Sequence, residues 1–332
     1  MIVLLIQVLL LGSCNNDMDL IDPIEPKPVV YCVFNPMDTA YYVSLTKSFV
    51  GDTNAFVLAK QPDRVFFDSA DIRLSGLDKD ENILFETGFE PCDIIKKPGI
   101  FPESNGYLYR SKRELDEFEQ FTISGQYSGI THFKLEIRIP GYDQSIESKI
   151  KRLDPAIIGK PSHDSIAFEF FPFEDYEYMI ASGFHDGGDC LDFIMRLRYK
   201  DCYKDSIIMR ETDILFRKDI YHKRTANFYI PPDFFLNKLL KYIPDDQDVE
   251  YRTLVNFDFI SINTLPEFKM YTETRELLSS DYHLVDWSNI TNGIGLFSMK
   301  NTFYRYNYTF TQKTKDSIAF SPVTAHLRFV RW

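Results

Sequence analysis

Short runs in which apolar and polar residues alternate recur along the chain, and they constrain its fold more than any other feature. The clearest is 132–139, His-Phe-Lys-Leu-Glu-Ile-Arg-Ile, which ends at Pro140-Gly141. Alternation places every second side chain on one face, so such a run predicts a half-buried β-strand. Less regular strand-like runs begin near 29, 41, 71, 165, 193, 249 and 304. Short strands separated by turn residues predict a mainly β protein.

The order of these runs predicts two β units. We expect an immunoglobulin-like β-sandwich at 29–150 and a second, antiparallel β domain at 151–332. Two segments interrupt the alternation, because 231–241 begins with two prolines and both it and 265–278 carry apolar residues at helical spacing. They predict two short helices, inserted in the second domain, that cover a sheet.

The N-terminus resembles a bacterial lipoprotein signal. A mostly apolar run, shorter than the roughly 20 residues that span a bilayer, ends in Leu11-Gly12-Ser13-Cys14. This tetrapeptide resembles a lipobox, so we expect a signal peptide at 1–13 and lipidation of Cys14. No Lys or Arg precedes the run, unlike most export signals. The alternative is a buried N-terminal strand that ends in an ordinary cysteine.

The segment 14–28 is acidic and rich in proline, as in an extended tether. It resembles the surface-export signals of Bacteroidota lipoproteins, and a plain solvated linker is the alternative. We therefore expect a lipid-anchored protein of the outer membrane that faces outward. The membrane, reached through the lipid, would be its first partner.

Composition limits the other partners. The net charge of −12 argues against nucleic acid and against an anionic lipid surface, because both carry negative charge. Hydrophobic residues make up 44% of the chain and aromatic residues 15%, which is enough to build a core.

Four cysteines follow Cys14, an even number that suits an oxidising compartment. Three pairings are possible. We favour Cys190–Cys202, within an expected hairpin, together with Cys32–Cys92 in the first domain. Reduced thiols in the core are the alternative.

One C-terminal motif resembles a known family. Residues 287–297, Trp-Ser-Asn-Ile-Thr-Asn-Gly-Ile-Gly-Leu-Phe, resemble a signature of the Bacteroidota lipoproteins catalogued as domain-of-unknown-function family 4249. Val43–Ser48 and Ala70–Leu74 resemble early strands of that family. The resemblance implies an accessory surface lipoprotein beside a TonB-dependent outer-membrane transporter, and it implies no reaction. The residues themselves predict a positive φ at Asn292-Gly293 and a close backbone approach at Gly295.

Five Asp-Ser/Thr-aliphatic triplets resemble the O-glycosylation sequon of Bacteroidota. The acceptor hydroxyls would be those of Thr39, Ser69, Ser165, Ser206 and Ser317. Each triplet is also a common turn before a strand, which is the simpler interpretation of any single one.

Signals for metal binding or catalysis are weak. His185, Asp186 and Asp189 could hold a divalent cation, but a plain turn is favoured because further acidic ligand positions are missing. The sequence has no GxSxG, HExxH or Walker motif. We therefore expect neither a cofactor nor an enzyme.

An alternating tyrosine row is the candidate ligand surface. Tyr304, Tyr306 and Tyr308 would share one face of a strand and could stack on sugars or peptides, with core packing as the alternative. The expected function is binding or accessory work beside a TonB-dependent nutrient transporter, with the ligand unidentified. The alternatives are a surface adhesion or spacer protein and, with less support, a hydrolase whose site has no recognised motif.

Overall fold

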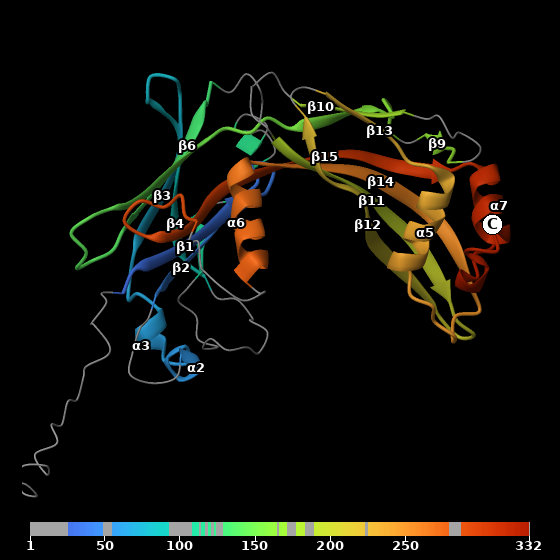
Figure 1. The fold of residues 1–332 in the computed structure, drawn as a ribbon, viewed down its shortest axis with the longest axis horizontal. Coiled ribbons are helices and arrows are strands. Elements are labelled where there is room, and N and C mark those ends of the chain that lie inside the picture. Colours follow the sequence, from blue (N-terminus) through green and yellow to red (C-terminus); the bar gives the residue numbers. More distant parts are fainter. Residues whose placement is uncertain are drawn as a thin grey trace, which may run out of the picture.

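The computed structural model describes most of the chain after residue 25. The described residues are 26–48, 55–92, 108–112, 114–116, 119–120, 123, 129–164, 166–170, 177–182, 189–222, 225–278 and 287–331. The fold is mainly β, with 48% of residues in strands and 18% in helices, so the predicted fold class is confirmed. Figure 1 shows two lobes joined by long strands that arch from one to the other.

The strands of the first lobe are part of one 12-stranded sheet that continues into the second lobe. In this part of the sheet the order is β15 (Ile294–Phe310), β1, β2, β5, β4, β3, β6 and β7. Their bounds are β1 Pro28–Phe34, β2 Tyr42–Lys47, β3 Asp71–Leu77, β4 Ile83–Pro91, β5 Leu108–Ser111, β6 His132–Arg138 and β7 Ile146–Lys151. Alternate side chains of these strands, such as Phe133, Leu135 and Ile137, are buried in one core. Two short helices, α2 (Ala55–Leu58) and α3 (Pro62–Val65), lie at the end of this lobe (Figure 1).

The second lobe has four long strands on one side of its core. They are β12 Ile207–His222, β11 Asp189–Cys202, β14 Tyr251–Thr264 and β15 Ile294–Phe310, in that order across the sheet. A smaller sheet also surrounds the core; its strands are β8 Ala156–Lys160, β10 Glu177–Ser182 and β13 Thr225–Tyr229. The short strand β9, Ala167–Phe168, pairs with β15. The helices of this lobe are α5 Pro232–Tyr242, α7 Gln312–Phe320 and η1 Ala325–Leu327. The core is aromatic, and the Phe170 and Phe235 rings stack 4.1 Å apart.

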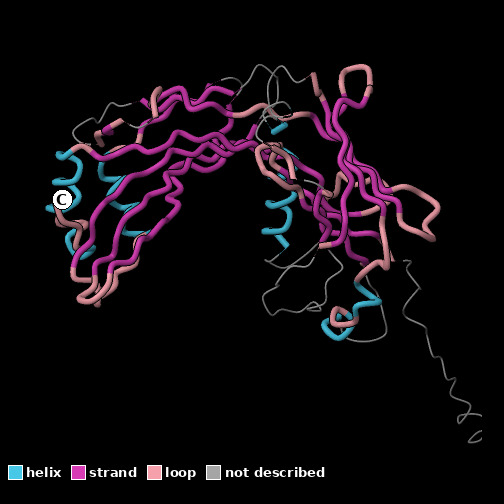
Figure 2. The backbone as a smooth tube through the Cα atoms, turned by 180° about the vertical axis from the view of Figure 1, so that it is seen from behind, coloured by secondary structure: helices cyan, strands magenta, loops and turns pink. Residues whose placement is uncertain are grey.

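Both predicted helices are present. The first is α5, which has Pro232 in its first turn and buries Phe235, Leu236 and Leu239 at helical spacing. The second is α6, Pro266–Leu278, which packs on β15 (Figure 1). Figure 2 shows from behind that strands dominate the molecule.

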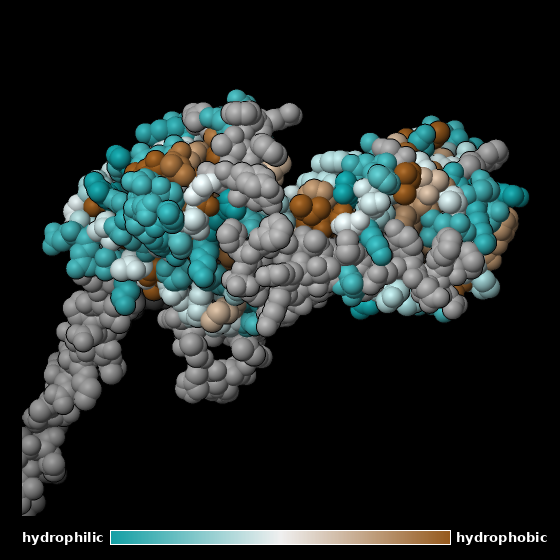
Figure 3. All heavy atoms as spheres, turned by 90° about the horizontal axis from the view of Figure 1, so that it is seen from above, coloured by the Kyte–Doolittle hydropathy of each residue, from teal (hydrophilic) through white to brown (hydrophobic). Residues whose placement is uncertain are grey.

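One strand, β15, belongs to both lobes. Residues 294–299 pair in parallel with β1, and residues 300–308 pair antiparallel with β14. β15 therefore crosses the domain boundary expected near residue 150, because its residues 294–299, late in the sequence, pair with β1 of the first lobe. The resulting waist between two masses is visible from above in Figure 3, where the described surface is mostly hydrophilic.

The crossing between the lobes is fixed by buried polar side chains. The amide nitrogens of Asn301 and Asn263 donate to the carbonyls of Leu153 and Asp154, at 3.3 and 3.0 Å. Asn263 and Asn301 are both fully buried and face each other across β14 and β15. The segment between β7 and β8 is thus hydrogen-bonded to β14 and to β15, two of the long strands of the second lobe.

The 287–297 motif serves this junction. Asn292 has φ 60°, which confirms the predicted positive φ in the Asn292-Gly293 turn. The predicted close approach at Gly295 is also confirmed, because a Cβ there would overlap the carbonyl oxygen of Val30 in β1. The Asn289 carboxamide bonds both the N–H and the C=O of Phe297, at 2.9 and 2.7 Å, which closes the loop onto β15.

Candidate functional site

Two of the three predicted tyrosines lie together on the outer face of the second lobe. The rings of Tyr304 and Tyr306 are stacked with centroids 5.2 Å apart and planes 7° apart. Tyr306 is 48% exposed, whereas Tyr308 is 0% exposed. The prediction that all three share one face is therefore wrong for Tyr308, whose ring packs on Phe257 and Phe259 in the core.

A β-bulge explains the difference. Between Phe259, which pairs with Arg305, and Phe257, which pairs with Tyr308, β15 has one residue more than β14. Asn307 sits in the extra position with φ 59°, a left-handed conformation that asparagine tolerates. One additional residue shifts the alternation by one, which moves Tyr308 to the core face.

Paired charges continue this face across three strands. Arg196 of β11 binds Asp213 of β12 through two nitrogens, at 2.8 and 2.9 Å. Arg198 donates to Glu211 at 2.8 Å and to Asp258 of β14 at 2.6 Å. We call these two arginines, their three carboxylates and the tyrosine pair the Tyr–Arg face.

The Tyr–Arg face and its bulge are connected. The second carboxylate oxygen of Asp258 accepts the backbone N–H of Asn307 at 2.9 Å. Asp258 is only 2% exposed, and its two oxygens thus hold Arg198 on one side and the bulge on the other. The position of Tyr306, next to the bulge, therefore depends on the same carboxylate that orients Arg198.

The electrostatics of this face favour binding by hydrogen bonds. The hydrogen bonds that Arg196 donates to Asp213 raise the pKa of Arg196, and the bond that Arg198 donates to Asp258 raises the pKa of Arg198, so both remain charged. Desolvation raises the pKa of Tyr304 and of Tyr306, so their hydroxyls stay protonated at neutral pH. The face therefore presents fixed donors and acceptors, with paired charges, to a polar partner.

A loop of the first lobe borders this face. Asn35, just after β1, donates to the hydroxyl of Thr302 on β15 at 3.3 Å. Asp38 in the same loop is close enough to Tyr304 to contribute to the raised pKa of the tyrosine. Desolvation raises the pKa of Asp38 itself, against the opposing charge of Lys300. Both lobes thus contribute charged or polar groups around the tyrosine pair.

The predicted disulfides are not formed. Cys190 and Cys202 lie at opposite ends of β11, and 12 residues of extended strand separate their Cα atoms by roughly 40 Å, whereas a disulfide needs about 4.4–6.8 Å. Cys32 and Cys92 are both thiols, and two strands, β2 and β5, lie between β1 and β4 in their sheet. The prediction placed both cysteines within one hairpin, but the hairpin of β11 and β12 turns after Cys202, so both cysteines lie on the same strand.

The glycosylation candidates lie in different settings. Thr39, Ser69 and Ser206 are exposed in loops or turns. Ser317 lies inside α7, where its carbonyl accepts a hydrogen bond from Ser321. Ser165 is outside the described residues. Glycosylation at these positions stays a prediction.

The remaining predicted site residues are mostly beyond the described part of the chain. Cys14, His185 and Asp186 lie outside it, and of Asp189 only the backbone, at the start of β11, is described. Among the described residues, no cluster of His, Cys, Asp and Glu could hold a metal ion. No described helix is long and apolar enough to cross a membrane.

Sequence reasoning missed the arginines and carboxylates of this face. A signal existed, because Arg196 and Arg198 are the polar positions of an alternating run and Glu211 and Asp213 have the same spacing in the next strand. Complementary charges at matching positions of two adjacent strands are favourable cross-strand pairs.

Comparisons with known proteins add no relative. A scan against models of protein families finds no match, and a search of curated proteins finds no similar sequence.

Proposed function

We propose that this chain is a lipid-anchored binding protein of the outer-membrane surface, acting as an accessory component beside a TonB-dependent nutrient transporter. The observation that carries the binding role is the Tyr–Arg face, because tyrosine and arginine are the residues most enriched where proteins bind partners. The lipobox at Cys14, the acidic tether and the resemblance of 287–297 to a family of surface lipoproteins support the location.

The chemistry of the face suits a polar partner surface better than a flat sugar ring. Stacking of the two rings against each other covers one face of each, which leaves less ring face for a sugar, while the hydroxyls remain available to hydrogen-bond a partner. Arg196 and Arg198 are already held by carboxylates, which reduces the entropy lost when a partner accepts hydrogen bonds from them. Binding would therefore use oriented donors on a preformed sheet.

The anchor is tested by metabolic labelling. Cells expressing the protein and fed a clickable palmitate analogue should incorporate label, and Cys14→Ala should abolish it because the acceptor thiol is gone. A Cys32→Ala variant, which alters a cysteine in the core, serves as the control and should keep the label. Label that persists in Cys14→Ala would refute the anchor.

The partner is tested by affinity purification of the full-length protein from solubilised outer membranes. The wild type should recover a TonB-dependent transporter. A Tyr304→Ser, Tyr306→Ser double variant should lower recovery about tenfold or more, as expected when interface tyrosines are lost. Tyr42→Ser, which changes a 45% exposed tyrosine on a strand of the first lobe, is the matched control and should recover the wild-type amount. Recovery of no transporter by the wild type would contradict the accessory role and favour the adhesion or spacer alternative.

A further inference from the structure

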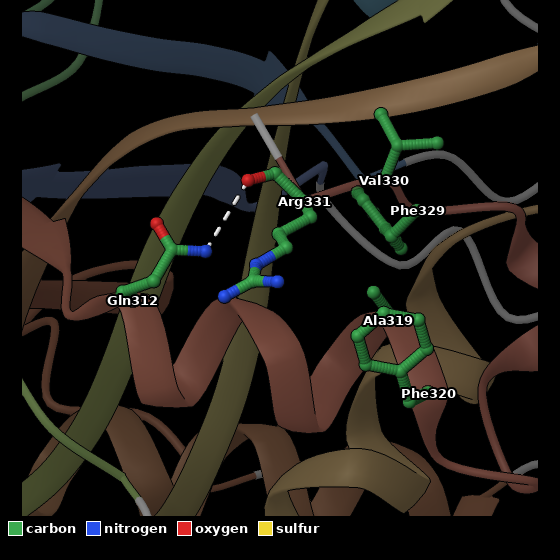
Figure 4. A pocket seen from close by; sticks show the side chains of 6 residues that line it. All are labelled: Gln312, Ala319, Phe320, Phe329, Val330 and Arg331. Atoms are coloured by element: carbon green, nitrogen blue, oxygen red, sulfur yellow. Dashed lines mark hydrogen bonds between the residues drawn. The ribbon is translucent and has the colours of Figure 1, made fainter.

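The far end of the second lobe has an open cavity of about 700 Å³ between α7 and the C-terminal segment. Its volume is in the range of small-molecule sites. Figure 4 shows the side chains that line it: Gln312, Ala319, Phe320, Phe329, Val330 and Arg331. This site lies on elements that the Tyr–Arg face does not use.

One end of the cavity is apolar. Ala319 and Phe320 from the end of α7 face Phe329 and Val330 from the C-terminal segment (Figure 4). Phe320 is 70% exposed, the largest exposed fraction among the large hydrophobic side chains described. Covering such a ring removes apolar surface from water, which favours an apolar ligand group at this end.

The other end is polar and preorganised. Gln312 donates to the backbone carbonyl of Arg331 at 3.3 Å (Figure 4). It also donates to the carboxylate of Asp316 at 2.9 Å. Nε of Arg331 lies 3.0 Å from the carboxylate of Asp316. Asp316 thus holds the guanidinium of Arg331 by one edge. The two terminal nitrogens of Arg331 donate to no residue in the described part of the chain.

Arg331 is the basic side chain that lines the cavity. Residues 312–331 carry more basic than acidic side chains, although the protein has a net charge of −12. Lys313 lies 3.5 Å from Glu169 and Arg328 donates to the carbonyl of Gln247, so both are engaged elsewhere. The guanidinium of Arg331 is therefore the group that favours an anion at this end.

We infer that this cavity binds an amphipathic carboxylate, with an acyl chain against Phe320 and Phe329 and the carboxylate on the terminal nitrogens of Arg331. The site goes beyond the proposed function, since it involves neither the anchor nor the Tyr–Arg face. The free acid, rather than an esterified lipid chain, is the ligand, because the guanidinium recognises the charged head.

The test is calorimetric titration of the full-length chain with Cys14→Ser, so that no acyl anchor competes, using sodium decanoate and methyl decanoate as probes. Decanoate should bind saturably at one site per chain. Arg331→Gln should weaken decanoate about fivefold, as for an exposed ion pair of about 1 kcal/mol, and should leave the weaker binding of the ester unchanged. Ala319→Trp should weaken binding of both, because the indole occupies the apolar end of the cavity where the acyl chain would lie.

Two further variants complete the test. Phe320→Ser should weaken both probes, whereas Ile207→Ser, a change at a 65% exposed residue at the start of β12, should change neither. Circular dichroism would establish that each variant is folded. Two results would overturn the inference: no saturable binding by the parent chain, or undiminished binding by folded Ala319→Trp. Binding that appears only with Trp332→Ala would also overturn it, because the side chain of Trp332 would then be the occupant of the cavity.

Discussion

Cys32 illustrates how one residue's surroundings decide its chemistry. Its side chain is completely buried in the core of the first lobe, and desolvation raises the pKa of the thiol to about 12. A thiol that stays protonated is neither a good nucleophile nor a ready partner for disulfide exchange. The even cysteine count that suggested a disulfide is therefore compatible with a thiol that acts as a small hydrophobic side chain.

We predict that Cys32 in the folded protein resists alkylation by iodoacetamide at pH 8 and reacts only after unfolding. Because burial raises its pKa above the unfolded value, its contribution to stability is fully present below about pH 9 and is lost as pH rises toward 12. Urea unfolding of wild type and Cys32→Val between pH 8 and pH 11 should show a steeper loss for the wild type. Rapid labelling of Cys32 in the native protein would contradict this.

Among the elements, strands with regular alternation could be predicted from the sequence, and departures from regularity could not. The run 132–139 predicted β6 because each residue's environment follows from its neighbours in sequence. The bulge at Asn307 and the pairing of β15 with β1 depend on contacts between residues far apart, which local pattern does not report. The Tyr–Arg face was accordingly found only in part, with Tyr308 misplaced and Arg196 unnoticed.

At the β1–β15 contact we predict that Gly295→Ala severely destabilises the protein, by about 3 kcal/mol or more, since the new methyl would overlap the Val30 carbonyl and force the strands apart. Gly141→Ala is the matched control. Gly141 also has a positive φ, +87°, but nothing lies within 4 Å of the position that a methyl group would occupy there. Its cost should be limited to backbone strain of about 1–2 kcal/mol. Urea unfolding of the two variants measures the difference, and equal losses would argue against the close packing.

On the scale of the whole molecule, the lobes are coupled in two ways. β15 runs through both, and the segment between β7 and β8 is bonded to Asn263 and Asn301 without exposure to solvent. Two units joined only by a flexible linker would unfold independently, whereas a shared strand and a buried polar junction favour a common transition.

We therefore predict one calorimetric unfolding transition for the wild type. An Asn263→Leu, Asn301→Leu double variant removes both amide donors and leaves two buried carbonyls without them, at a cost of about 1–3 kcal/mol each. It should unfold at lower temperature and in two resolved steps. The control is Asn256→Leu, which changes an asparagine on the outer face of β14 and should keep the single transition. Two resolved transitions in the wild type would show that the lobes are independent.

The position of β15 also has a consequence for how the chain matures on the ribosome. β1 is among the first strands made, yet its neighbour opposite β2 is contributed by residues 294–299. Until residues 294–299 have been synthesised, one edge of β1 has open backbone donors and acceptors, and such edges invite wrong pairing. The first lobe is thus completed only after β8 to β14 of the second lobe have been made, which makes it a natural client for chaperones that hold unfolded chains.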